Sequence, residues 1–239
     1  MIDIDTVYQR VLSLANKEQR GYITPQEFNL FANQAQMSIF DQYFYDYNQF
    51  SRVAGNSSEH SDMLDLLEEK IDLFAETEVL NYNNAGFFSL PDYFYKTTSM
   101  QYDYGGGNQG DANVIVERVD KKEYFNIINS PLALPTKKRP IYYREGGSVF
   151  VFPVDLQGQG VQDLICNFIV KPETVVWSYN VVKGHALYSG NGVHSQLHES
   201  EENNLVLKIL ALAGIVLQDP GVYQIANAEE VKSIQQEKQ

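Results

Sequence analysis

The segment Asn16–Glu27 has the length and several of the residue types of a twelve-residue calcium-binding loop. An oxygen ligand stands first, Gly21 stands sixth and the carboxylate of Glu27 stands twelfth, as such a loop requires for coordination and for its sharp turn. The fifth position is Arg20, whose guanidinium cannot coordinate a cation and would place a fixed positive charge inside the site. No second loop of this kind follows in the sequence, although such loops usually work in pairs.

The end of the same segment also has the pattern of a helix start. Thr24 can serve as the N-cap, Pro25 as the first helical residue and Glu27 as the partner that completes a capping box. In this arrangement the side-chain oxygens bond to backbone N–H groups instead of a cation. We therefore expect a helix to begin here, and we retain an EF-hand-like calcium-binding module as an alternative.

Three histidines and a single cysteine are the other side chains that could do chemistry. His185, His194 and His198 lie close together in the sequence, but turn-like surroundings provide no apolar scaffold to hold metal ligands in place. Cys166 lies in the apolar run 164–170, which is typical of a buried structural thiol. No serine-nucleophile elbow is present. We therefore predict no catalytic residue, no metal, no cofactor and no enzymatic activity.

Composition predicts a folded protein with an acidic surface. The chain has 239 residues, 21% of them charged and 13% aromatic, and is long enough to bury a sizeable core. It has neither an apolar run long enough to cross a bilayer nor the basic start of a signal peptide, so we expect a soluble protein made in a cytoplasm. A net charge of −13 argues against wrapping DNA or binding an anionic membrane. The same charge suits a surface past which DNA slides without sticking.

Helical periodicity occurs in the first third of the chain and near its end. Apolar residues recur at spacings of three and four over 4–15, 25–50 and 61–74, which predicts three helices. A second capping box predicts a short helix over 120–128. The segment 204–217 is apolar on more than one side, so we expect a helix that is buried on several sides.

Strand signals fill the middle of the chain. Runs at 140–144 and 148–152 flank the turn 145–147 and predict a β-hairpin. Runs at 163–170 and 173–179 form a further candidate pair of strands. The fold class predicted is α+β, with an N-terminal helical bundle region, a small mixed β domain carrying an inserted short helix, and a C-terminal helix. The corresponding regions are 1–80, 81–199 with the inserted helix near 121–128, and 200–239 with the polar tail.

Several features indicate contacts with other chains. Tyrosine is abundant, with 16 residues against one tryptophan, and it suits partly buried interfaces between subunits. The basic loop Thr136–Arg139 could dock onto an acidic neighbour. The expected interface side chains are aromatic residues of the second helix, basic residues of that loop and leucines of the last helix. They are Phe28, Phe31, Phe40, Tyr43, Lys137, Lys138, Arg139, Leu207, Leu210 and Leu217.

Seven motifs in three parts of the chain carry a resemblance to a known family. The first part is residues 16–36, and the third is the helix 205–214 with the following Asp219–Pro220. The middle part comprises residues 90–93, 116–124, 129–132 and 139–146. Together these motifs resemble virion structural proteins of tailed bacteriophages, particularly crAss-like and related short-tailed phages. The resemblance spans most of the chain, and its motifs are structural.

The resemblance implies a head-tail connector, a portal adaptor or tail ring that stacks beneath the portal in cyclic, usually twelvefold, symmetry. The implied partners are other copies of the chain, the portal protein and other tail ring or nozzle proteins, with no membrane. Genomic DNA would pass through the ring without specific binding. The implied location is the virion, at the head-tail junction or in the tail, after assembly in the host cytoplasm. An alternative within this class is another minor virion or cargo protein.

Overall fold

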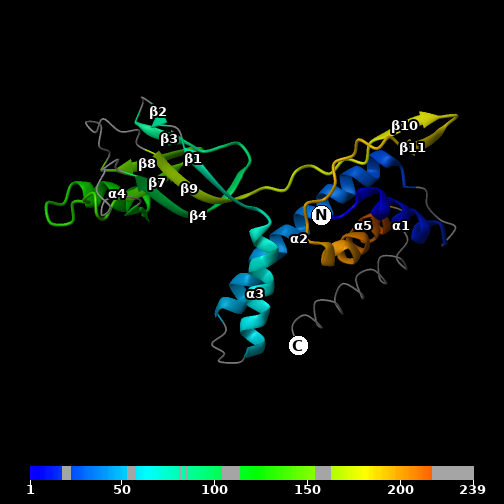
Figure 1. Cartoon of the computed structure of the whole chain (residues 1–239), viewed down its shortest axis with the longest axis horizontal. Helices are drawn as coiled ribbons and strands as arrows, with labels where there is room; N and C mark the ends of the chain where they lie inside the picture. Colours follow the sequence, from blue (N-terminus) through cyan, green and yellow to red (C-terminus); the bar gives the residue numbers. More distant parts are fainter. Residues whose placement is uncertain are drawn as a thin grey trace. The chain divides into compact units, whose positions relative to one another are not determined.

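The computed structural model describes residues 1–17, 23–52, 58–80, 82–83, 86–103, 114–153 and 163–216. Helices and strands both occur, which confirms the α+β class (Figure 1). The chain forms two compact units. Unit 1 consists of the described residues up to Leu73 and from Pro172 onward, and unit 2 consists of Phe74–Lys171.

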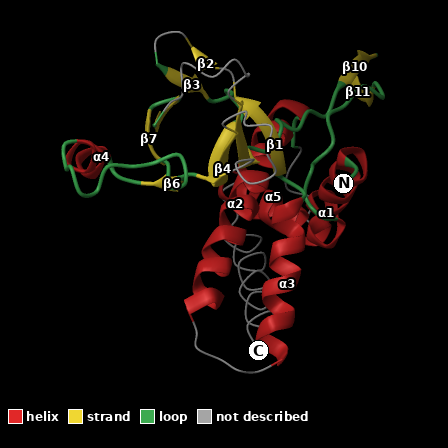
Figure 2. Cartoon of the chain, turned by 60° about the vertical axis from the view of Figure 1, so that its left-hand side comes forward, coloured by secondary structure: helices red, strands yellow, loops and turns green. Residues whose placement is uncertain are grey.

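Unit 1 is built mainly from helices, which Figure 2 shows in red. The helices are α1 (Ile4–Lys17), α2 (Pro25–Arg52), α3 (Ser58–Asp72), the 3-10 helix η1 (Glu199–Glu201) and α5 (Glu202–Val216). All four predicted helices of this unit are confirmed to within three residues at each end. A hairpin of two strands, β10 (Tyr179–Val182) and β11 (His185–Tyr188), completes the unit.

The capping box at the start of α2 is confirmed by its hydrogen bonds. The backbone N–H of Glu27 donates to the Thr24 hydroxyl oxygen at 3.3 Å, and the backbone N–H of Thr24 donates to the Glu27 carboxylate at 3.0 Å. The Thr24 hydroxyl also donates to that carboxylate, at 2.7 Å, and these bonds lower the pKa of Glu27. The carboxylate that would be the twelfth ligand of a calcium loop is thus engaged in capping, while Arg20 and Gly21 lie outside the described residues.

Helix α5 packs against both α1 and α2, which explains its apolar character. Leu205 and Ile209 are fully buried, and Ala213 is nearly so. Burying a leucine or isoleucine contributes about 1.5–3 kcal/mol, so this helix is a main source of cohesion in unit 1. The prediction that α5 is buried on more than one side is therefore confirmed within a single chain.

Residues 173–179 do not form the predicted strand partner of β9. Strand β9 (Asp163–Val170) pairs with β1 (Ala75–Leu80) on one side and with β4 (Phe94–Asp103) on the other, so it has no free edge. The chain after Pro172 instead runs extended along α2, within unit 1.

Side-chain amides of α2 bind this extended segment as a neighbouring strand would. The Asn33 amide accepts from the backbone N–H of Val175 and donates to its carbonyl, both at 2.8 Å. Asn29 makes the same pair of bonds to Trp177, at 2.7 and 3.3 Å. Four residues of helix rise about 6 Å and two residues of strand span about 6.6 Å, so the two repeats match. We call this set of bonds the amide clamp.

Unit 2 contains two sheets around one core. One sheet has the order β1-β9-β4-β5, and the other has the order β2-β3-β8-β7-β6. The remaining strands are β2 (Tyr82–Asn83), β3 (Phe87–Ser89), β5 (Val114–Ile115), β6 (Glu117–Arg118), β7 (Ile141–Glu145) and β8 (Ser148–Phe152). Phe88 and Val149 from the second sheet pack with Leu164 and Phe168 from the first. Only the β6–β7 pair is parallel among the described strands.

The predicted hairpin and inserted helix of unit 2 are both confirmed. Strands β7 and β8 pair antiparallel around Gly146, whose φ of +59° is readily adopted by glycine. Helix α4 (Lys121–Ile128) has Asp120 at its N-cap and Asn129 at its C-cap. The Asp120 side chain makes no capping hydrogen bond, however, so the second predicted capping box is corrected. Tyr124 instead anchors α4 by packing on the ring of Tyr143 at 4.4 Å.

The two units differ from the three consecutive regions predicted from the sequence. Residues 75–80, assigned to the helical region, form β1 and join unit 2 through β9. Residues from Pro172 onward, assigned to the β domain up to 199, join unit 1 through the amide clamp. Among the described helices, none combines the length and apolarity needed to span a membrane.

Candidate interaction surface

The three histidines have separate local roles in the structure. His194 accepts a hydrogen bond from the backbone N–H of Ile4 at 3.3 Å, close to the N-terminus. His198 caps η1 by accepting from the backbone N–H of Ser200 at 3.2 Å. His185 lies at the tip of the β10–β11 hairpin. In the described part of the chain, no three His, Cys, Asp or Glu side chains form a group that could hold a metal ion.

Cys166 is a fully buried residue of β9 in the core of unit 2. Burial raises the pKa of its thiol to about 11. A thiol with that pKa is protonated near neutral pH, and the thiolate is the nucleophilic form. The geometry thus gives Cys166 a packing role.

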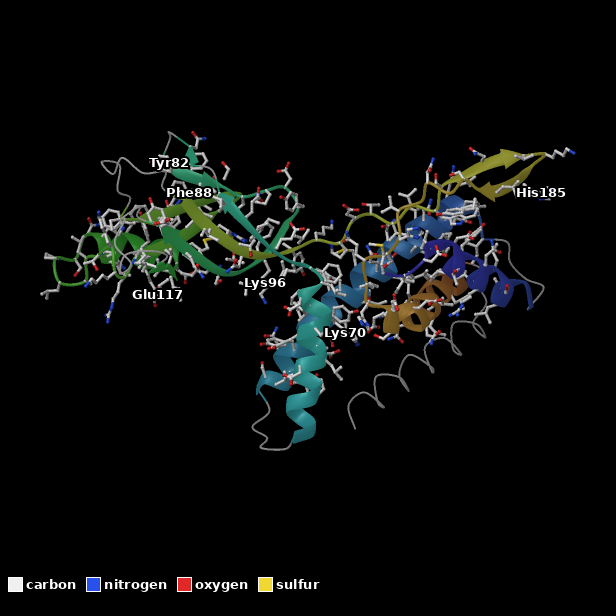
Figure 3. All side chains as sticks on the ribbon, in the orientation of Figure 1. Lys70, Tyr82, Phe88, Lys96, Glu117 and His185 are labelled. Carbon is white, nitrogen blue, oxygen red and sulfur yellow. The ribbon has the colours of Figure 1, made fainter. Side chains whose placement is uncertain are left out.

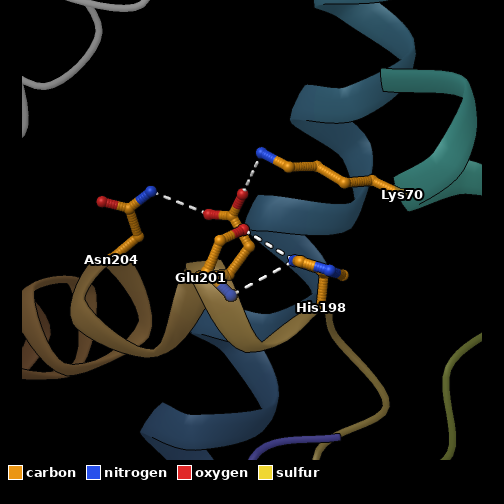
Figure 4. A network of polar contacts seen from close by, with 5 residues as sticks. Lys70, His198, Glu201 and Asn204 are labelled. Carbon is orange, nitrogen blue, oxygen red and sulfur yellow. Dashed lines mark hydrogen bonds and ion pairs between the residues drawn. The ribbon is translucent and has the colours of Figure 1, made fainter. Parts of the chain in front are cut away.

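A largely buried ion pair joins α3 to η1, the 3-10 helix that leads into α5 (Figure 4). Lys70 of α3 contacts the Glu201 carboxylate at 2.6 Å, and the Asn204 amide donates to the other oxygen of that carboxylate at 2.7 Å. Glu201 is only 4% exposed. Removing one partner from such a pair leaves an unpaired buried charge, which is strongly destabilising. These side chains therefore hold α3 and η1 together at the start of α5.

The structure divides the predicted interface residues into interior and surface positions. Phe28, Phe40, Tyr43 and Leu210 are buried within unit 1, so their assignment to a contact with another chain is corrected. Phe31 and Leu207 are half-buried, and Lys137, Lys138 and Arg139 are exposed in unit 2. Leu217 lies outside the described residues. Helical periodicity identified apolar faces correctly, but it does not distinguish a face covered by the same chain from one left open.

An open groove of about 730 Å³ runs between α1 and α5. Leu14, Val206 and Leu207 provide apolar lining, and Asp5 and Gln9 are among its polar side chains. Leu14 is 43% exposed. Arg10, which also lines the groove, is held by an ion pair with Glu202 at 2.9 Å. The α1–α5 groove is thus an open groove with an apolar lining and polar margins.

The β10–β11 hairpin carries the second exposed apolar surface of unit 1, and it extends beyond the helices of that unit (Figures 1 and 3). Its turn is formed by Lys183 and Gly184, both with positive φ, the geometry of a tight hairpin turn. Val181 is 66% exposed, Val182 is 49% exposed and Leu187 is 54% exposed. No third strand joins this pair among the described residues.

The base of the hairpin is anchored by the single tryptophan. Trp177 is 1% exposed, and its ring stacks with Tyr179 at 5.6 Å and with Tyr188 at 5.8 Å. Its indole N–H donates to the Asp5 carboxylate at 2.9 Å. The base therefore packs on the core of unit 1 through Trp177, whereas the tip beyond Tyr179 is covered by no described element. Sequence reasoning missed this hairpin, although the Lys183–Gly184 turn between β-branched and aromatic residues was a usable signal.

No family model matches the chain, and no curated protein matches its sequence.

Proposed function

We propose that this chain is a virion structural protein that forms a ring at the head-tail junction, as a portal adaptor or tail ring. The observation that carries the proposal is the α1–α5 groove, which leaves Leu14 and Leu207 accessible beside a helix otherwise packed into the core. Exposed apolar surface bordered by polar residues is a mark of protein–protein contact sites. The resemblance of the chain's motifs to phage virion proteins supplies the kind of assembly.

The charge of the chain fits this role. Each copy carries a formal charge of −13, and several copies in a ring would present a strongly negative conduit to DNA phosphates. Repulsion would keep DNA from adhering as it passes. The partners proposed are further copies of the chain, the portal protein, and other tail ring or nozzle proteins.

The test uses one substitution in the groove and a matched one elsewhere. Leu207→Glu places a charge in the apolar lining, whereas Leu30→Glu alters a leucine of α2 that is 70% exposed and does not line the groove. Each variant is supplied in trans to a phage that lacks the wild-type protein, and its copy number in purified particles is measured by quantitative mass spectrometry.

We expect the Leu30→Glu variant to enter particles at wild-type copy number and the Leu207→Glu variant to be absent from them. Circular dichroism should show both variants folded, because both positions have access to water. Wild-type incorporation of the folded Leu207→Glu variant would contradict the role of the groove. Absence of the wild-type protein itself from particles would contradict the proposed function.

A further inference from the structure

The β10–β11 hairpin lies in a part of the chain that contains no acidic residue. Residues 174–198 include neither Asp nor Glu, although the whole chain has 31 of them. The same stretch has one lysine, Lys183, at the tip of the hairpin. Two copies of a chain with net charge −13 repel each other over most of their surfaces. This hairpin is a surface with which one copy can approach another without that repulsion.

At the tip of the hairpin, each face carries exposed apolar side chains that no described element covers. Val181 lies opposite Ala186 on one face, and Val182 lies opposite His185 on the face that also carries Leu187. A two-stranded hairpin is at best marginally stable in water unless another element packs on it. Its tip therefore gains stability from a binding site that contacts both faces at once.

The α1–α5 groove has the matching properties. It is open, it has the apolar lining residues Leu14, Val206 and Leu207, and it holds about 730 Å³. Asp5 also lines the groove and supplies a carboxylate, one oxygen of which accepts the Trp177 indole N–H, while the charge of Arg10 is already paired with Glu202. A hairpin tip with valines and one lysine thus meets apolar surface for the valines and an opposite charge for Lys183.

We infer that the tip of the β10–β11 hairpin of one copy inserts into the α1–α5 groove of a second copy. This inference rests on the proposed function, since it names the contact by which copies join into a ring. The hairpin and the groove are different surfaces of the same unit, so the contact is heterologous. Contacts of that kind run head to tail and produce closed rings or open filaments.

The experiment mixes two variants that are each defective on one side of the contact. Val181→Glu disables the hairpin and Leu207→Glu disables the groove. Sedimentation velocity is measured for the full-length wild type, for each variant and for their equimolar mixture, at concentrations up to about 1 mM. We expect assemblies larger than dimers for the wild type, monomers for each variant alone, and dimers for the mixture. The dimers arise because the intact hairpin of one variant fits the intact groove of the other.

The control substitution is Ile115→Glu in β5 of unit 2. Ile115 is 71% exposed, close to the 66% of Val181, and it belongs to neither surface. The control should assemble as the wild type does, and circular dichroism should show every variant folded. These solution measurements are independent of particle incorporation, so the inference can fail while the proposed function stands.

Four results would overturn the inference. The first is a mixture that remains monomeric, and the second is a folded Val181→Glu variant that assembles like the wild type. The third is a wild type that stays monomeric or stops at dimers, as a reciprocal twofold contact would. The fourth is a chain truncated after Asp219 that self-associates more strongly than the full-length chain. That result would indicate that residues 220–239 of the same chain occupy the groove.

Discussion

Two hairpins of this chain each have a two-residue turn but opposite surroundings. In β7–β8 the turn is Gly146–Gly147, and in β10–β11 it is Lys183–Gly184, so each connects antiparallel strands through two residues. The first hairpin lies inside a five-stranded sheet and packs Val149 and Val151 into the core of unit 2. The second has no neighbouring strand among the described residues and exposes Val181 to water.

The difference shows that local sequence determines whether a hairpin forms, but not whether its side chains are buried in the core or left exposed. Turn residues and β-branched residues are sufficient to specify the pairing of two strands. Whether their side chains stabilise the fold depends on the elements that cover them. Covered valines contribute to the stability of unit 2, whereas uncovered valines remain available for a partner.

The largest expected effect comes from placing the same charge in each hairpin. Val149→Asp buries an unpaired carboxylate at a fully buried site, and we expect unit 2 to lose several kcal/mol of stability or to unfold. Val181→Asp should change the free energy of unfolding of the monomer by about 0.5 kcal/mol or less, because the site is exposed there. Urea denaturation followed by circular dichroism measures both changes. Equal destabilisation by the two substitutions would contradict the comparison.

A smaller effect is expected from the amide clamp that leads into the exposed hairpin. Asn33→Ala removes both hydrogen bonds to Val175 and leaves its backbone groups without those partners, which costs about 1–3 kcal/mol per buried group. Trp177 is the only tryptophan of the chain, so its fluorescence reports unfolding. In Asn33→Ala we expect the fluorescence transition at a lower denaturant concentration than in the wild type. Gln34→Ala, at an exposed position of the same helix, is the control. If both variants unfolded at the same denaturant concentration, the clamp would have no measurable role.

The smallest effect is expected at the start of α2. Thr24→Ala should reduce stability by about 0.5–2 kcal/mol, because it removes the N-cap side chain. Since hydrogen bonds from Thr24 lower the pKa of folded Glu27, the contribution of that carboxylate is present above the usual glutamate pKa of about 4.3. This contribution to stability is lost as the pH falls through the lowered pKa of Glu27 in the folded protein. NMR titration should therefore show the Glu27 pKa rising in Thr24→Ala, and an unchanged pKa would contradict the capping interaction as its cause.

Some features determined by neighbouring residues could be predicted from the sequence. The capping box of Thr24 and Glu27 and the hairpin predicted around residues 145–147 each depend on a few adjacent residues, and both are confirmed, with Glu145 in strand β7. Strand β1 was missed because it is a polar edge strand, with Glu76 and Glu78 among its exposed residues.

Features that join distant parts of the chain could not be predicted in this way. The extended path of residues 173–178 depends on amides of α2 more than 130 positions away in the sequence. Phe28 and Phe40 were assigned to an interface from their helical spacing, and the structure buries them inside unit 1. The α1–α5 groove likewise joins helices from opposite ends of the chain, so only Leu207 among its lining residues was predicted as an interface residue.

The measurement that tests the account most directly is a cryo-electron microscopy map of the intact virion, averaged around the head-tail axis. We expect density for the fold of unit 1 in a closed ring at this junction, with each β10–β11 hairpin seated in the α1–α5 groove of the next copy. Density for this chain only in the capsid interior, or in copies without a closed ring, would contradict the account and favour a minor virion or cargo protein.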